Sequence, residues 1–161
     1  MSEEYKLLAQ LPFADPEPEA IQRIAAHLEM PVSLGPEGAP EVNTDAFLIY
    51  AFLPDDVDRK AATDLFALDT NLTLVFTDPD EPERLAPSPV ATTMTKIGLL
   101  LAAVYTARGI IVTDYTPSSI VLRFENGQVT LNQDWDGWRT MPEALAVIPE
   151  PRTMKSLKGR T

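Results

Sequence analysis

The chain has 161 residues, of which 45% are hydrophobic, with 15 prolines and no cysteine. This length favours one domain with its own core. The absence of cysteine excludes disulfides, thiol chemistry and zinc sites built on cysteine. The net charge of −11 is unevenly placed, with 18 acidic and 5 basic side chains in residues 1–87, 5 and 4 in residues 88–149, and 1 and 4 in residues 150–161. Such an acidic field repels nucleic acid and anionic membranes and attracts basic proteins.

The first third of the chain contains one clear helix. Residues 5–11 fit either a strand or a short helix. Asp15 and Pro16 then open a helix that we expect to reach about residue 29, because Asp is a capping residue and proline is tolerated in the first turn. Its buried face contains Ile21, Ile24, Ala25 and Leu28. Residues 31–44 are rich in Gly and Pro and predict a loop, with a short strand at 32–34.

The next segment alternates strand, helix and strand. Residues 46–53 are almost continuously apolar, which predicts a central strand covered on both faces. A helix should begin at Pro54–Asp56, with Val57, Ala61, Leu65 and Leu68 as its buried stripe. Residues 72–76 predict another strand. An acidic, proline-rich loop over 77–87 follows.

The centre of the expected fold is a long helix over about residues 89–108. Ile97 to Tyr105 is apolar all round, which indicates a helix buried on every side. The 11 residues between Lys96 and Arg108 carry no charge, but a bilayer-spanning helix needs about 20 apolar residues. Gly109 suits the residue that ends a helix, and the β-branched residues 110–113 predict a strand.

Residues 120–131 carry the clearest local signal, a β-hairpin. Asn126-Gly127 is the preferred two-residue turn because both positions need positive φ. With this turn, Phe124 faces Val129 and Leu122 faces Leu131 on the apolar side, while Arg123 faces Thr130 on the polar side. We expect the apolar side to pack on the long helix. A short helix over about 142–147 comes next.

Together these elements predict an α+β fold. We expect a mixed or mostly antiparallel sheet of about five or six strands, with the long buried helix of residues 89–108 packed on one face. Residues 1–149 should form a single domain. Residues 150–161 lack an apolar pattern and predict a basic, mobile tail.

The sequence offers no catalytic constellation. His27 is the only histidine and has neither an orienting carboxylate nor a nucleophile near it in sequence. No Gly-x-Ser-x-Gly motif is present. Asp55, Asp56 and Asp58 at a helix start are typical of capping and dipole interactions. We therefore expect a non-catalytic protein that binds no cofactor or metal.

One segment has ligands at metal-binding spacing. Residues 132–143 resemble the twelve-residue EF-hand loop, with Asn132, Asp134 and Asp136 as oxygen ligands, Gly137 at the turn and Glu143 as the bidentate carboxylate. The sequence departs from that loop in having Asn at the first position and Arg139 at the usual apolar one, and in being entered from a strand. The alternative is a polar turn that contains aspartates.

The charge distribution points to a binding function. We expect the acidic front half to bind a basic protein, in the manner of an immunity protein that masks a toxin, and a homodimer is left open. A small secretion-type chaperone is the alternative. The start of the chain lacks the basic and apolar blocks of a secretory signal, so we expect a cytoplasmic protein without nucleic acid or membrane partners. The predicted partner surface comprises Glu37, Glu41, Asp55, Asp56, Asp58, Asp78, Asp80, Glu81, Glu83, Trp135 and Trp138, although the tryptophans would equally close the core.

Overall fold

The fold is described from a computed structural model of the chain. It describes residues 4–11, 16–29, 31–34, 40–43, 48–52, 54–77, 95–96, 98–99, 108–113, 119–140, 142–148 and 152–157. The strands are β1 (Glu4–Gln10), β2 (Ser33–Leu34), β3 (Pro40–Asn43), β4 (Leu48–Phe52), β5 (Leu72–Thr77), β6 (Arg108–Val112), β7 (Ile120–Glu125), β8 (Gln128–Asn132) and β9 (Thr153–Lys155). The helices are α1 (Pro16–Leu28), α2 (Asp56–Phe66), α4 (Gly137–Thr140) and α5 (Pro142–Ala146).

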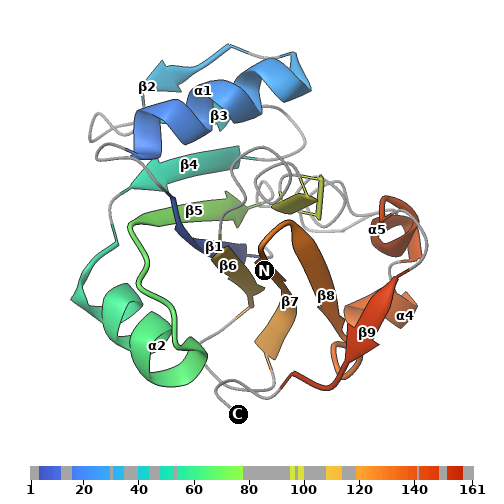
Figure 1. Ribbon diagram of the computed structural model, residues 1–161. Helices are drawn as coiled ribbons and strands as arrows, with labels where there is room; N and C mark the ends of the chain where they lie inside the picture. Colours follow the sequence, from blue (N-terminus) through green and yellow to red (C-terminus); the bar gives the residue numbers. More distant parts are fainter. Residues whose placement is uncertain are drawn as a thin grey trace.

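The described strands form one sheet in the order β2-β3-β4-β5-β1-β6-β7-β8-β9 (Figure 1). All neighbours are antiparallel except β8 and β9, which run parallel. The first strand of the chain, β1, lies between β5 and β6. It therefore joins two groups of strands that are neighbours in sequence, β2 to β5 on one side and β6 to β8 on the other. The α+β class and the mixed sheet agree with the prediction, but the expected five or six strands are too few, because the described residues form nine.

Helices cover both faces of this sheet. Leu7 and Leu8 on β1 point to opposite faces, since side chains alternate along a strand. Leu7 belongs to the larger core cluster, which contains Ile21 and Ile24 of α1. Leu8 belongs to a second cluster that contains Ala62 of α2. Helix α1 lies across β3 and β4, as Figure 1 shows, and α2 covers the other face.

The centre of the sheet differs from the prediction. Strand β4 was expected to be central and covered on both faces, but it lies third from the β2 edge, and its Leu48 and Tyr50 are only half-buried. Strand β1, for which the sequence allows either a strand or a helix, lies in the middle of the sheet and is buried on both faces: Leu7 and Leu8 are each 0% exposed. The burial of a strand depends on which strands and helices lie beside it, and the sequence of the strand itself does not specify these neighbours.

The β7–β8 hairpin confirms its prediction. Phe124 pairs with Val129, Arg123 with Thr130 and Leu122 with Leu131. Asn126 and Gly127 have φ of 53° and 78°, the positive values that the Asn-Gly turn requires. The predicted register is therefore the observed one.

The expected long helix is corrected where the structure describes it. Most of residues 89–108, including Ile97 and the run from residue 100 to 107, lies outside the described residues. Residues 95–96 and 98–99 are helical, but Arg108 already belongs to β6. In the described parts the helices are short, and the longest, α1, has 13 residues. A Cβ on Gly98 would contact the side chains of Ile111 on β6 and Leu122 on β7, so Gly98 lies against the apolar side of these two strands.

Gly109 has a different role from the predicted one. It is a strand residue of β6, not a helix-ending residue in the left-handed region. A Cβ at this position would lie 2.2 Å from Cζ of Phe124. The glycine is needed because the Phe124 ring, which is 0% exposed, packs directly on the backbone of β6.

The C-terminal segment is also corrected. Residues 150–161 were expected to form a tail outside the domain, but Thr153–Lys155 pair with β8 in parallel. Leu157 is buried against the second core cluster. Parallel pairing needs a crossover between the strands, and here α4 and α5 lie in that crossover. The three residues of an edge strand carry no local pattern from which this pairing could be predicted.

Candidate functional site

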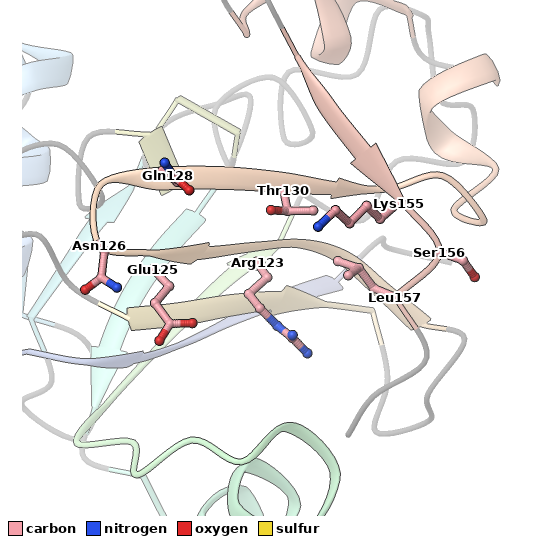
Figure 2. Close-up of a pocket in the computed structure, with 8 residues that line it drawn as sticks. All are labelled: Arg123, Glu125, Asn126, Gln128, Thr130, Lys155, Ser156 and Leu157. Atoms are coloured by element: carbon pink, nitrogen blue, oxygen red, sulfur yellow. The ribbon is translucent and has the colours of Figure 1, made fainter. Parts of the chain in front are cut away.

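A polar groove lies over the β7–β8 hairpin and the C-terminal segment (Figure 2). Its volume is about 390 Å³. The lining residues are Arg123, Glu125, Asn126, Gln128, Thr130, Lys155, Ser156 and Leu157. Arg123 and Thr130 are cross-strand partners, and Glu125 pairs with Gln128, so all four side chains rise from one face of the hairpin. Leu157 is the single apolar side chain among the lining residues.

The two ends of the groove differ in character. Asn126, Gln128 and Glu125 lie at the hairpin turn, whereas the Lys155 side chain extends toward Thr130 at the other end (Figure 2). The Glu125 carboxylate pairs with Arg108, whose Nε lies 3.2 Å from Oε1. Ser156 donates its hydroxyl to Asp134. The lining cations are thus Arg123, which is half-buried, and Lys155, which is exposed.

Asn132 fixes the C-terminal segment beside this groove. It is 0% exposed, and its Nδ2 donates to the carbonyl of Ile120 at 2.7 Å. Its Oδ1 accepts from the backbone N–H of Leu157 at 3.0 Å and from that of Asp134 at 3.2 Å. One amide side chain therefore links β7, the turn after β8 and the segment that follows β9.

The same contacts bear on the EF-hand resemblance. The Oδ1 of Asn132 is occupied by two backbone donors, Asp134 accepts from Ser156, and Asp136 accepts from Arg139. Side-chain oxygens of three residues that the resemblance assigns to calcium thus accept hydrogen bonds from other groups of the protein. In the described part of the chain, no group of three or more Asp, Glu or His side chains is placed to hold a metal ion. These contacts favour the polar-turn alternative.

The start of α2 carries a second candidate surface. Asp55 caps the helix, its Oδ1 accepting from the N–H of Asp58 at 2.8 Å, as predicted. Asp58 itself points inward, where it is 1% exposed and accepts from Thr73 Oγ1 at 3.1 Å. Lys6 Nζ lies 3.6 Å from its other oxygen. Asp58 is therefore a buried structural carboxylate and is removed from the predicted partner surface.

The inward turn of Asp58 leaves Val57 outside. Val57 was expected in the buried stripe, yet it is 64% exposed, more than the other exposed large hydrophobics of the described residues. Ala61 and Leu68 of the predicted stripe are buried as expected, and Asp58 and Ala62 are buried with them. Asp55 and Asp56 beside Val57 are both exposed. We call Asp55, Asp56 and Val57 the α2 surface.

The remaining predicted acidic residues are less informative. Glu41 is half-buried on β3. Five others lie outside the described residues: Glu37, Asp78, Asp80, Glu81 and Glu83. His27 is exposed on α1.

The two tryptophans form an aromatic cluster with Tyr5. The ring centroids of Trp135 and Trp138 are 4.7 Å apart in an edge-to-face arrangement, and Trp135 lies 6.3 Å from Tyr5. Trp138 is 5% exposed and belongs to the larger core cluster. Trp138 therefore fits the alternative that the pair closes the core, and it is removed from the predicted partner surface. Trp135 is half-buried.

Sequence reasoning missed the groove. Its signal was present in part, because the predicted register places Arg123 opposite Thr130 on the polar side of the hairpin. Lys155 could not be added, since its position depends on the parallel pairing of β9 with β8.

Comparisons with protein-family models, with curated proteins and with solved structures each find no match. Within the described ranges, no helix combines the length and the apolar character needed to cross a bilayer.

Proposed function

We propose that the protein is a non-catalytic binding protein that recognises a basic protein partner through the α2 surface. The observation that carries this proposal is Val57, an apolar side chain that is 64% exposed next to the exposed carboxylates of Asp55 and Asp56. Asp55 has a structural role as the helix cap, and both it and Asp56 interact favourably with the helix dipole. The exposed Val57 side chain, in contrast, neither caps the helix nor interacts with its dipole.

The α2 surface is rigidly mounted, which favours binding because little order has to be gained on association. Asp58 ties the first turn to Thr73 on β5, and Ala62 packs against Leu8 in the second cluster. At the other end, the C-cap Ala67 adopts the left-handed conformation, and its carbonyl accepts from Arg108. Both ends of α2 are thus fixed to the sheet.

The charge around α2 supports a basic partner. Residues 54–70 carry four exposed carboxylates, on Asp55, Asp56, Asp64 and Asp69, against the exposed cations of Arg59 and Lys60. Lys60 pairs with Asp64. A local excess of negative charge in a chain of net charge −11 accelerates encounter with a basic protein and sets its orientation.

The test combines capture and kinetics. A photo-crosslinking residue at position 57 captures the partner in the source cells, with the same residue at position 139 as the control site. Association rates are then measured for the wild type and for Asp55→Ser/Asp56→Asn, in which serine retains a capping oxygen. We expect this variant to slow association roughly tenfold at low salt and far less at high salt.

The matched control is Glu19→Gln/Glu29→Gln, which removes one charge from α1 and one from the residue that follows it, and should leave the rate near that of the wild type. Equal rates for both double variants would contradict the proposal, as would a captured partner without excess positive charge. The chaperone alternative instead expects a dimer in sedimentation and binding of extended peptides that is insensitive to Val57→Asp.

A further inference from the structure

Residues 152–157, which we call the β9 segment, attach to the domain as a bound peptide would. Thr153–Lys155 pair with β8 at one end of the described sheet (Figure 1), and the side chains of residues 153–156 are exposed. Leu157 differs, since it is only 9% exposed. Peptides that add a strand to a sheet gain affinity from backbone pairing and specificity from a few side-chain pockets. The β9 segment shows the same combination of backbone pairing and one apolar anchor.

The groups that receive the β9 segment belong to the rest of the domain. The Oδ1 of the buried Asn132 accepts from the Leu157 N–H at 3.0 Å. The backbone N–H of Gln133 donates to the carbonyl of Lys155 at 2.8 Å. The Leu157 side chain lies in the second core cluster, whose other members are Leu8, Ala62, Leu68, Ile110, Val112 and Ile120. This site therefore requires an extended segment with an apolar anchor, whichever copy of the chain supplies it.

A short connection joins the β9 segment to the core. Ile148 is 5% exposed and belongs to the larger core cluster, and Pro149-Glu150-Pro151 separates it from Arg152. Proline fixes its own φ and favours extended backbone in the residue before it. The five residue steps from Ile148 to Thr153 span at most about 17 Å when extended. A connection of this length can deliver the segment to β8 of a second copy that lies within that distance.

We propose that the protein forms a dimer by strand exchange, in which the β9 segment of each copy pairs with β8 of the other. Leu157 of one copy then completes the second core cluster of the other copy and donates its N–H to that copy's Asn132. A second copy is the occupant that the observations favour, because the register, the anchor and the buried acceptor already fit this sequence. The exchange involves no residue of the α2 surface, so it is independent of the partner proposed for that surface.

The exchange replaces each contact of the β9 segment with β8, Asn132 and the second core cluster by an identical one. The monomer and the dimer therefore differ mainly in how the segment is delivered. Within one chain, a short connection holds the segment at an effective concentration of roughly 1 mM. The exchanged dimer should be populated as the protein concentration approaches about 1 mM.

The test traps the exchanged form with a disulfide, because the chain contains no cysteine of its own. Thr130 and Thr153 are partners in register on β8 and β9. Neighbouring strands lie about 4.8 Å apart, within the Cα separation of about 4.4–6.8 Å that a disulfide bridges. A Thr130→Cys chain is mixed with an isotope-labelled Thr153→Cys chain at about 0.5 mM, near the expected effective concentration, and oxidised in air. Neither chain can form this disulfide by itself, so a mixed disulfide dimer reports exchange.

Two controls measure the background and the role of the anchor. Thr63→Cys, at an exposed position on α2, replaces Thr130→Cys and measures random collision with the Thr153→Cys chain. We expect the 130–153 pair to give roughly tenfold more mixed dimer than the 63–153 pair, since only exchange holds the two thiols together. Leu157→Ala in the Thr153→Cys chain removes the anchor and should lower the yield severalfold, with circular dichroism as the check that this variant is folded.

A single chain that carries both Thr130→Cys and Thr153→Cys should form the same disulfide internally at about 10 µM, far below the effective concentration. Failure of this internal disulfide would overturn the proposal, because the register on which it depends would be wrong. The proposal is also overturned if the 130–153 pair gives no more mixed dimer than the 63–153 pair, or if Leu157→Ala leaves the yield unchanged.

Discussion

Replacement of Asn132 by alanine should destabilise the protein by about 3 kcal/mol, because two buried backbone groups lose their partners. The Ile120 carbonyl and the Leu157 N–H both depend on this side chain, at 2.7 and 3.0 Å. A buried polar group left without a partner costs about 1–3 kcal/mol. The third contact, from the N–H of Asp134, adds little, since Asp134 is exposed and water can replace the lost acceptor.

The assay is urea denaturation. The m-value, which is the dependence of the unfolding free energy on urea concentration, should be the same for the variant and the wild type if both unfold in two states. For a chain of this size, about 3 kcal/mol corresponds to a fall in Tm of roughly 10 °C. Hydrogen exchange should show lost protection at the Leu157 amide specifically. Gln133→Ala, at the next and exposed position, is the matched control and should change stability little. A loss below about 1 kcal/mol for Asn132→Ala would refute the reasoning.

Asn132→Asp separates the two interpretations of residues 132–143. In an EF-hand loop, aspartate at the first position adds a charge and should tighten calcium binding. In this structure the substitution replaces the donor Nδ2 by an oxygen that faces the Ile120 carbonyl, which lies 2.7 Å from Nδ2 in the native protein. We therefore expect lower stability and no calcium-dependent rise in Tm. A rise in Tm with calcium would revive the metal-binding loop.

Two further substitutions test the packing of the sheet. Gly109→Ala should destabilise the protein by about 1–3 kcal/mol, because its Cβ would meet the ring of Phe124 at 2.2 Å. The control is Gly98→Ala, whose Cβ would meet only the ends of two flexible side chains, at 3.1 and 3.7 Å. Equal falls in Tm for the two variants would contradict the packing argument. Asp58→Ala should destabilise by about 1–3 kcal/mol by leaving the buried Thr73 hydroxyl without its acceptor, whereas Asp58→Asn retains an acceptor and should recover part of this loss in urea denaturation.

The sequence by itself determined the local elements that rest on short-range geometry. The hairpin turn at Asn126-Gly127 and its register were predicted correctly, because a two-residue turn sets the pairing of both strands. The cap at Asp55 and the buried face of α1 followed in the same way from the preferences of individual residues and from helical periodicity. These features need no information about distant parts of the chain.

The tertiary structure alone decided which strands are neighbours, and through this it decided the candidate sites. The insertion of β1 between β5 and β6, and the parallel pairing of β9 with β8, depend on contacts between residues far apart in sequence. The rotation of α2 depends on such a contact as well, since Asp58 turns inward to meet Thr73 and Lys6 and so exposes Val57. Hydrophobic burial is non-directional, so periodicity shows that a residue can be buried but not which partner will cover it.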